Sequence, residues 1–350
     1  MTILIFRQSG IGKSALLSTW AERHRKHHPE DVVVSHFIGC PGSTVSAHAP
    51  QIVRRLLSEI DAVLSGSKEA NAGTSFDGFS TDIVEKNKKK RRIVLIIDGF
   101  DKLEARDNAH DLVWLPQFFV PEYIRVIVAT ATYTFKEDST PTVAQKLAMS
   151  CYETLKKRGY PELEITPLKE GERKSILRLC LKNNGKQLED SLELTIASSF
   201  QSSFPRFLKT LCDDICVFQK HEDLKGRITY DLEAQNISQL YRIVVERLQH
   251  DYHKGTTDVA KLFLGMIWAS KRGIHLDKEL GPILEQEAGL LEADWIELFV
   301  VIDELLSNSS GLLSFSNHEI SRGVELQLFP NEDDQIVFHK MVGEKNCRFQ

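Results

Sequence analysis

One stretch near the N-terminus constrains this chain more than any other. Residues 3–6 are apolar, a glycine-containing loop follows them, and an amphipathic segment begins at Lys13. This is the order of a buried strand, a short loop and a helix start. The loop ends in Gly12-Lys13-Ser14, which completes the pattern G-x-x-x-x-G-K-[ST], but Arg7 stands where that pattern has its first glycine. The sequence therefore predicts a phosphate-binding loop, with a Cβ at Arg7 expected to strain the turn.

The predicted loop has the chemistry that a polyphosphate needs. Gly10 and Gly12 let backbone N–H groups turn inward, and the following helix points its positive end at the same place. Lys13 would reach the outer phosphates, and the Ser14 hydroxyl would coordinate Mg²⁺. The predicted nucleotide-binding residues of this loop are Ser9, Gly10, Ile11, Gly12, Lys13, Ser14 and Ala15. An ordinary strand-turn-helix with chance glycines is the structural alternative, and the strand and helix on either side favour nucleotide binding over it.

A second apolar strand supplies the other half of such a site. Residues 93–97 are all β-formers, and they end in Asp98-Gly99-Phe100-Asp101. On a parallel strand beside the first, Asp98 at the C-terminal edge could hold Mg²⁺ through water and Asp101, one turn further on, could orient an attacking water. Thr130, at the end of the strand predicted over 123–130, would contact a γ-phosphate or simply serve as a good strand residue, and both interpretations stay open.

Composition excludes several classes of protein. A length of 350 residues suits two or three domains, and 42% hydrophobic with 27% charged residues is typical of a soluble globular protein. We find neither an apolar run long enough for a membrane span nor a cleavable signal, so we expect a cytoplasmic protein. The net charge of -5 argues against a general nucleic-acid-binding surface. The six cysteines lack metal-ligand spacing and are expected to be reduced thiols.

A basic run at 86–92 and two turn-rich segments are expected to lie at the surface. The run would serve as a nuclear-localisation signal or as a solvated flank of the adjacent apolar strand, and the flank is favoured. Residues 65–80 are rich in Gly, Ser, Ala and Asn, and a turn is predicted at 41–43. Both segments are expected to be surface loops.

Alternating strand and helix patterns predict an α/β fold over the first half of the chain. Strands are expected at 3–6, 31–38, 93–97, 123–130 and 163–165, and helices at 13–26, 49–64 and 143–158. This alternation is typical of a doubly wound parallel sheet, and we assign it to a P-loop nucleotide-binding domain over residues 1–166.

Beyond Pro167 the pattern becomes helical. Helices predicted at 171–183, 190–200, 206–219 and 237–252 form a helical domain over residues 167–254. Three further helices (258–271, 278–285 and 293–306), a turn at 309–311 and a strand at 312–315 predict a winged-helix-like domain over 255–323. DNA reading is disfavoured because its second and third helices are acidic. Residues 324–350 are expected to form a polar, disordered tail.

With these residues in view, the chain resembles the STAND-class NACHT ATPases, especially the group of nephrocystin-3, telomerase protein component 1 and the tetratricopeptide-repeat NACHT proteins. Residues 9–17, 36–39, 98–101 and 114–116 are similar to blocks of that group in its order, and the resemblance covers roughly residues 3–323. It implies an ATP/ADP-binding module with Mg²⁺. It also implies that Pro205 packs on adenine and that His318 contacts the ADP β-phosphate in a closed state.

Two kinds of function follow from these observations. The first is a switch that ATP opens and ADP closes, with slow or absent hydrolysis, so that a surface exposed on opening assembles protein partners or further copies of the chain. The second is a non-hydrolysing interaction scaffold. Intact Lys13, Ser14, Asp98 and Asp101 favour the switch, whereas Arg7 favours the scaffold. A small-molecule P-loop kinase is a distant third. Because Met1 almost directly precedes the first strand and no repeat array follows residue 323, we expect a fragment, a truncated isoform or a degenerate copy.

Overall fold

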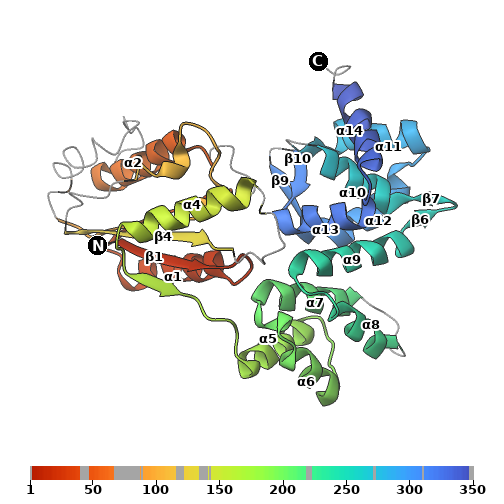
Figure 1. Cartoon of the computed structure of the whole chain (residues 1–350), viewed down its shortest axis with the longest axis horizontal. Coiled ribbons are helices and arrows are strands. Elements are labelled where there is room, and N and C mark those ends of the chain that lie inside the picture. Colours follow the sequence, from red (N-terminus) through yellow and green to blue (C-terminus); the bar gives the residue numbers. More distant parts are fainter. Residues whose placement is uncertain are drawn as a thin grey trace. The chain divides into compact units, whose positions relative to one another are not determined.

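The computed structural model describes residues 2–39, 47–66, 87, 90–115, 122–133, 141, 143–217, 223–270, 273–309 and 311–346. The chain divides into two compact units, Met1–Pro167 and Leu168–Gln350, each of which is visible in Figure 1. The boundary falls where the alternating strand and helix pattern was predicted to end. The predicted turn at 41–43 and most of the predicted loop at 65–80 lie outside the described residues, as do Cys40, Pro116 and Cys347.

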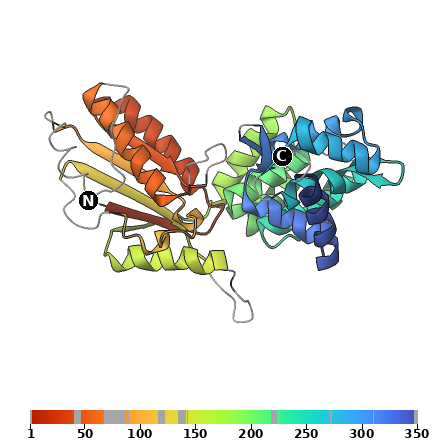
Figure 2. The same ribbon diagram turned by 90° about the horizontal axis from the view of Figure 1, so that it is seen from above.

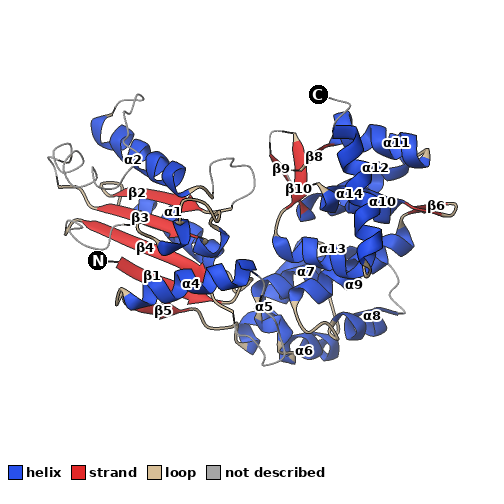
Figure 3. Cartoon of the chain, turned by 45° about the horizontal axis from the view of Figure 1, so that its top comes forward, coloured by secondary structure: helices blue, strands red, loops and turns tan. Residues whose placement is uncertain are grey.

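The first unit is built on a parallel sheet of five strands in the order β2-β3-β4-β1-β5 (Figures 2 and 3). The predicted doubly wound α/β fold is therefore confirmed. Its strands are β1 (Thr2–Arg7), β2 (Val32–Phe37), β3 (Ile93–Asp98), β4 (Ile124–Ala131) and β5 (Glu162–Glu164), and its helices are α1 (Lys13–His27), α2 (Ala49–Ser65) and α4 (Val143–Lys157).

Helices cover both faces of this sheet. On one face α2 and α4 pack against Leu4, Leu95 and Val128, and on the other α1 packs against Ile5 and Ile96. All six residues of β3 are buried, as expected for a parallel strand covered on both sides. By contrast, the edge strand β5 is exposed along its whole length and carries two glutamates, which discourage pairing with another chain.

The second unit contains two hydrophobic cores that share one helix. The first core lies among α5 (Glu170–Asn183), α6 (Asp190–Ser198), α7 (Pro205–Val217) and α8 (Leu224–Asp231). The second lies among α10 (Val259–Ala269), α11 (Gly281–Ala288), α12 (Glu292–Ile302), α13 (His318–Leu328) and α14 (Glu332–Asn346). Helix α9 (Ile237–Asp251) gives Leu240 and Ile243 to the first core and Val245 and Leu248 to the second. Helix α8 was not predicted, because its short sequence shows no strong apolar stripe.

A small antiparallel sheet and a hairpin complete the second unit. The sheet has the order β8 (Ile274–His275), β10 (Leu312–Phe315), β9 (Leu306–Ser309), and the hairpin joins β6 (His253–Lys254) to β7 (Thr257–Asp258). Within the described residues, every helix is too short or too polar to cross a lipid bilayer.

Helix α13 lies directly on α9 because a glycine stands at the crossing point. A Cβ on Gly323 would come within 2.5 Å of the Tyr241 Cβ and 3.0 Å of the Ser238 carbonyl oxygen. A side chain would therefore push the two helices apart. An ion pair of 2.9 Å between Arg206 and Glu319 also joins α7 to α13. The predicted helical domain and the block after it are thus in direct contact.

The prediction of a disordered tail is wrong for residues 324–346. Helix α14 packs on α10 through Phe338, whose ring would be 2.4 Å from a Cβ on Gly265. Phe338 and Val342 are buried, and the Phe329 ring lies 4.5 Å from that of Trp268. Only a few apolar residues, spaced one turn apart among many charges, make this contact, so the average polarity of the segment concealed it.

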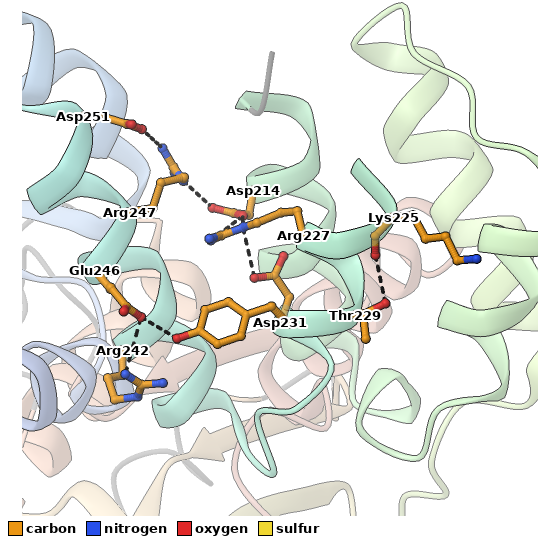
Figure 4. A network of polar contacts seen from close by, with 10 residues as sticks. Asp214, Lys225, Arg227, Thr229, Asp231, Arg242, Glu246, Arg247 and Asp251 are labelled. Carbon is orange, nitrogen blue, oxygen red and sulfur yellow. Dashed lines mark hydrogen bonds and ion pairs between the residues drawn. The ribbon is translucent and has the colours of Figure 1, made fainter. Parts of the chain in front are cut away.

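An ion network lies buried among α7, α8 and α9 (Figure 4). Asp214 accepts from the Arg227 Nε–H at 3.0 Å and from the Arg247 Nε–H at 2.8 Å. Asp231 lies 3.2 Å from the same Arg227 Nε. Asp251 pairs with Arg247 at the exposed rim. Burial, followed by repulsion from Asp214, raises the pKa of the Asp231 carboxyl to about 7.

This raised pKa makes the stability of the fold depend on pH. The stabilising contribution of a carboxyl whose pKa is raised in the folded state is complete below its ordinary pKa, and it is lost as pH rises through about 7. We expect the Tm of Asp231→Asn to decline less than that of wild type between pH 5 and pH 8. At pH 8 the Tm of the variant should be the higher one, by about 2–4 °C for each kcal/mol of stability gained. Thermal melts followed by circular dichroism measure this. Asp251→Asn, at the rim of the same network, should keep the wild-type pH dependence, and equal slopes for wild type and Asp231→Asn would contradict the assignment.

Candidate functional site

The predicted site residues of the first unit meet at one edge of the sheet. Because β1, β3 and β4 are parallel, their carboxyl ends lie together, with Asp98 opposite Ala129 and Arg7 opposite Ala131. The sequence predicted the Asp98 strand beside the first strand, but β4 lies between β3 and β1. The shared edge still brings the start of α1 to the end of β3, where Ser14 contacts Asp98. The two segments that the sequence pattern singled out are thus neighbours in space.

The loop turns at its glycines. Gly10 and Gly12 have φ of 81° and 95°, in the left-handed region where a side chain would be strained. Gly12 directly precedes α1, so the first N–H groups of that helix open towards the loop. Lys13 is almost wholly buried, and its ammonium group donates to the carbonyl oxygens of Arg7 at 2.8 Å and Gln8 at 3.1 Å.

Arg7 does not strain the turn, which corrects the expectation from the sequence. It is the last residue of β1, in extended backbone, and it is not among the described residues with positive φ. The left-handed turns come later, at Gly10 and Gly12, so a Cβ is tolerated at this position. Its guanidinium forms an ion pair with Glu164 of β5.

The Ser14 hydroxyl donates a hydrogen bond to the Asp98 carboxylate, across 84 residues of sequence. Asp98 is only 3% exposed, and burial raises the pKa of its carboxyl. The hydrogen bond from Ser14 and the positive charges of Lys13 and Lys102 oppose that rise. Two side chains that would both face a metal ion are therefore already in contact.

Asp101 and Thr130 have structural contacts of their own. The Asp101 carboxylate accepts from the Ala131 N–H at 2.8 Å and so ties the turn after β3 to the end of β4. Thr130 is fully buried, and its hydroxyl donates to the Ala131 carbonyl at 3.4 Å. A phosphate contact at Thr130 would require the hydroxyl to leave that bond.

The remaining predicted residues fall into two groups. Ser9, Ile11 and Ala15 lie in or next to the loop, with the Ile11 side chain buried and that of Ala15 exposed. Pro205 and His318 lie in the second unit, where each is the first residue of a helix, α7 and α13. His318 is exposed and follows Asn317, whose side chain caps α13 by accepting from the Ile320 N–H at 3.0 Å.

Sequence reasoning missed Glu164 and Lys102. Glu164 partners Arg7 only because β5 pairs with β1, which no local pattern indicates. Lys102 directly follows Asp101, but its place beside Asp98 depends on how the turn folds. Among the described residues, no three His, Cys, Asp or Glu side chains gather as a metal-binding cluster, and Cys151, Cys180, Cys212 and Cys216 are free thiols.

The burial of Asp98 yields a test of its role. Because the folded-state pKa is raised, the stabilising contribution of this carboxyl is lost as pH rises through that pKa. Asp98→Asn removes the buried charge and keeps an oxygen that accepts from Ser14, so the Tm at pH 8 without nucleotide should equal or exceed that of wild type. Asp98→Ala, which removes the acceptor and leaves a cavity, should lower it. Differential scanning calorimetry compares the three, and a Tm for Asp98→Asn as low as that of Asp98→Ala would overturn the expectation.

Known proteins are similar to this chain over nearly its whole length. A TPR repeat-containing protein of Dictyostelium discoideum is 33% identical over 380 residues, which cover 97% of this chain and 22% of that protein. Nephrocystin-3 of Mus musculus is 24% identical over 352 residues, with 96% of this chain and 24% of that protein covered. The chain thus spans a quarter or less of the length of these two relatives. No family model matches it.

Two solved structures superpose on most of this chain at low sequence identity. A Walker-type ATPase of Pyrococcus abyssi superposes with a TM-score of 0.43 at 9% identity, covering 93% of this chain and 91% of that chain. The ORC2 protein of Aeropyrum pernix, in ADPNP–ADP complexes, gives 0.43 at 12% identity, with 93% and 88% covered. The α/β fold described above follows from the strand pairing of this chain itself.

Proposed function

We propose that this chain is an adenine-nucleotide-binding module of the STAND NACHT class that couples its ATP or ADP state to the assembly of protein partners. The observation that carries the proposal is the hydrogen bond between Ser14 and Asp98 at the edge where the glycine loop opens. A loop, a helix N-terminus and a buried carboxylate converge there, as a magnesium-bound polyphosphate requires.

Each residue of the loop has a role in this proposal. Ser14 and Asp98 would hold Mg²⁺, which neutralises charge on the outer phosphates. Backbone N–H groups from Ser9 to Ala15 would contact the phosphate oxygens. Lys13 already lies under the loop with its charge held by two carbonyl oxygens, so it would meet those phosphates without a large movement of its stem.

Hydrolysis in this proposal is slow or absent. Asp101 would orient water, but one of its oxygens is engaged by the Ala131 N–H. The segment from Ala129 to Thr132 contains no arginine that would stabilise the leaving charge. If turnover is absent altogether, the chain is a nucleotide-holding interaction scaffold, and sensitive ATPase measurements with Asp101→Asn as control separate these two forms of the proposal.

The second unit would sense the nucleotide. The order α10, β8, α11, α12, β9, β10 is that of a winged helix, which supports the proposed winged-helix-like domain over 255–323 after a helical domain over 167–254. In the closed state Pro205 would pack on adenine and His318 would contact the β-phosphate. The TPR repeats named in a relative and the net charge of -5 both favour protein partners over nucleic acid.

The first test of this proposal is nucleotide binding itself. Replacing Lys13 by Ala removes a charge-assisted contact worth roughly 1.5–3 kcal/mol, so the affinity for Mg-ATP should fall about ten- to hundredfold. Isothermal titration calorimetry gives the dissociation constant of Mg-ATP for wild type and for Lys13→Ala. Lys26→Ala, on the exposed end of the same helix, serves as the control and should bind like wild type. Equal curves for wild type and Lys13→Ala would refute the site.

The second test concerns the switch. A ligand shifts a two-state protein only through contacts that differ between its states, and His318 would be such a contact for ADP. His318→Ala should weaken ADP more than ATP, with a coupling of roughly 1–3 kcal/mol. The exposed histidine His250 offers a control, since His250→Ala should leave both affinities unchanged. Equal losses for the two nucleotides, or none, would remove His318 from the mechanism.

A further inference from the structure

Helices α7 and α13 begin side by side in the second unit, where both lie next to α9 (Figures 1 and 3). The Arg206 guanidinium, in the first turn of α7, donates to the Glu319 carboxylate, in the first turn of α13, at 2.9 Å. One turn further on, both helices meet the same side chain of α9. The Thr210 hydroxyl donates to the Tyr241 hydroxyl at 3.2 Å, and a Cβ on Gly323 would lie 2.5 Å from the Tyr241 Cβ. Because Thr210 and Gly323 each stand four residues after a member of the ion pair, the two helices run alongside each other from a shared start.

The ion pair stands where α7 alone gives no reason for it. A helix N-terminus favours anions and disfavours cations, so Arg206 is unfavourable for α7 whereas Glu319 is favourable for α13. The Glu319 side chain is only 12% exposed, and the arginine offsets the burial of its carboxylate. The pair therefore holds the two helix starts together more firmly than an ion pair on the open surface would.

Pro205 and His318 stand one position before the two members of this pair. Each is the first residue of its helix, so the shared start brings them near each other in the second unit. The His318 backbone is held on both sides, by the Asn317 cap and by the ion pair of Glu319. The proposed function assigns the adenine to Pro205 and the β-phosphate to His318, and a bound ADP would need these two residues at a fixed separation.

We propose that Arg206 and Glu319 are positioning residues of the nucleotide sensor, which hold His318 at the separation from Pro205 that a bound diphosphate requires. This inference rests on the proposed function, because it deepens the role given there to His318. Neither member of the pair has to touch the nucleotide. Loss of either one releases the start of α13 from that of α7, so the contact with the β-phosphate is weakened while the contacts of the loop around Lys13 remain.

The test uses two variants of the full chain. Glu319→Gln removes the carboxylate charge and keeps the shape of the side chain, and Arg206→Met removes the guanidinium and keeps an unbranched stem. In calorimetric titrations we expect each variant to bind Mg-ADP about three- to tenfold more weakly and Mg-ATP less than about twofold more weakly. The sign for Glu319→Gln is decisive, because loss of an anion near a phosphate would strengthen binding through charge alone. Melting curves verify that each variant is folded.

Two further forms show whether the pair acts through His318. In the His318→Ala background, Glu319→Gln should change the affinity for Mg-ADP less than about twofold, because the residue through which it acts is gone. Lys209→Met is the matched control on α7. It breaks ion pairs with Asp213 at 2.8 Å and Glu304 at 3.0 Å, and it should leave both nucleotide affinities unchanged.

The outcomes separate this inference from the proposed function. If His318→Ala weakens Mg-ADP selectively but Glu319→Gln does not, or does so equally with and without His318, the positioning role is overturned while the sensor stands. If His318→Ala leaves Mg-ADP binding unchanged, or wild type binds neither nucleotide, the proposed function itself fails and this inference fails with it. A selective loss of Mg-ADP for Glu319→Gln that disappears in the His318→Ala background supports the inference.

Discussion

The first unit depends on one buried carboxyl group, that of Asp98 at the end of β3. Removing Asp98 from water is costly, and the surroundings offset the cost only in part, through one hydroxyl and two nearby ammonium groups. A fold selected for stability alone would place an apolar residue there, in line with the five before it in β3. A buried carboxyl at this edge of the sheet is what the proposed magnesium site requires, and the proposal depends on it.

The same constraint explains which parts could be predicted from the sequence. The strand before Asp98 and the strand-loop-helix around Lys13 are long and strongly patterned, so their type, order and approximate bounds followed from periodicity alone. That Ser14 and Asp98 would be neighbours followed from the rule that parallel strands end at a common edge. What did not follow is every contact that depends on two segments meeting without a local signal. Glu164 beside Arg7 and Lys102 over Gly39 are of this kind.

Misjudged elements in the second unit have a related cause. Helix α14 is held by Phe338, whose ring packs over Gly265, and by Val342, on a background of charged residues. Such a contact is a property of the partner surface as much as of the segment, so composition alone predicted disorder. Helix α8 is similar, because its place depends on Arg227 and Asp231 joining a network whose other members come from α7 and α9.

Inside the second unit, the contact between α9 and α13 limits how a nucleotide signal could be transmitted. Conformational switches pass between discrete packings, and a helix can slide on its neighbour only where side chains leave a second set of grooves. At Gly323 the backbones of α13 and α9 are too close for such sliding, since even a methyl group there would overlap Tyr241. Helix α9 also contributes to both cores. It therefore links α13, which begins at His318, to α7, which begins at Pro205. A contact made by either residue would therefore act on α7, α9 and α13 as one body, not on a joint between them.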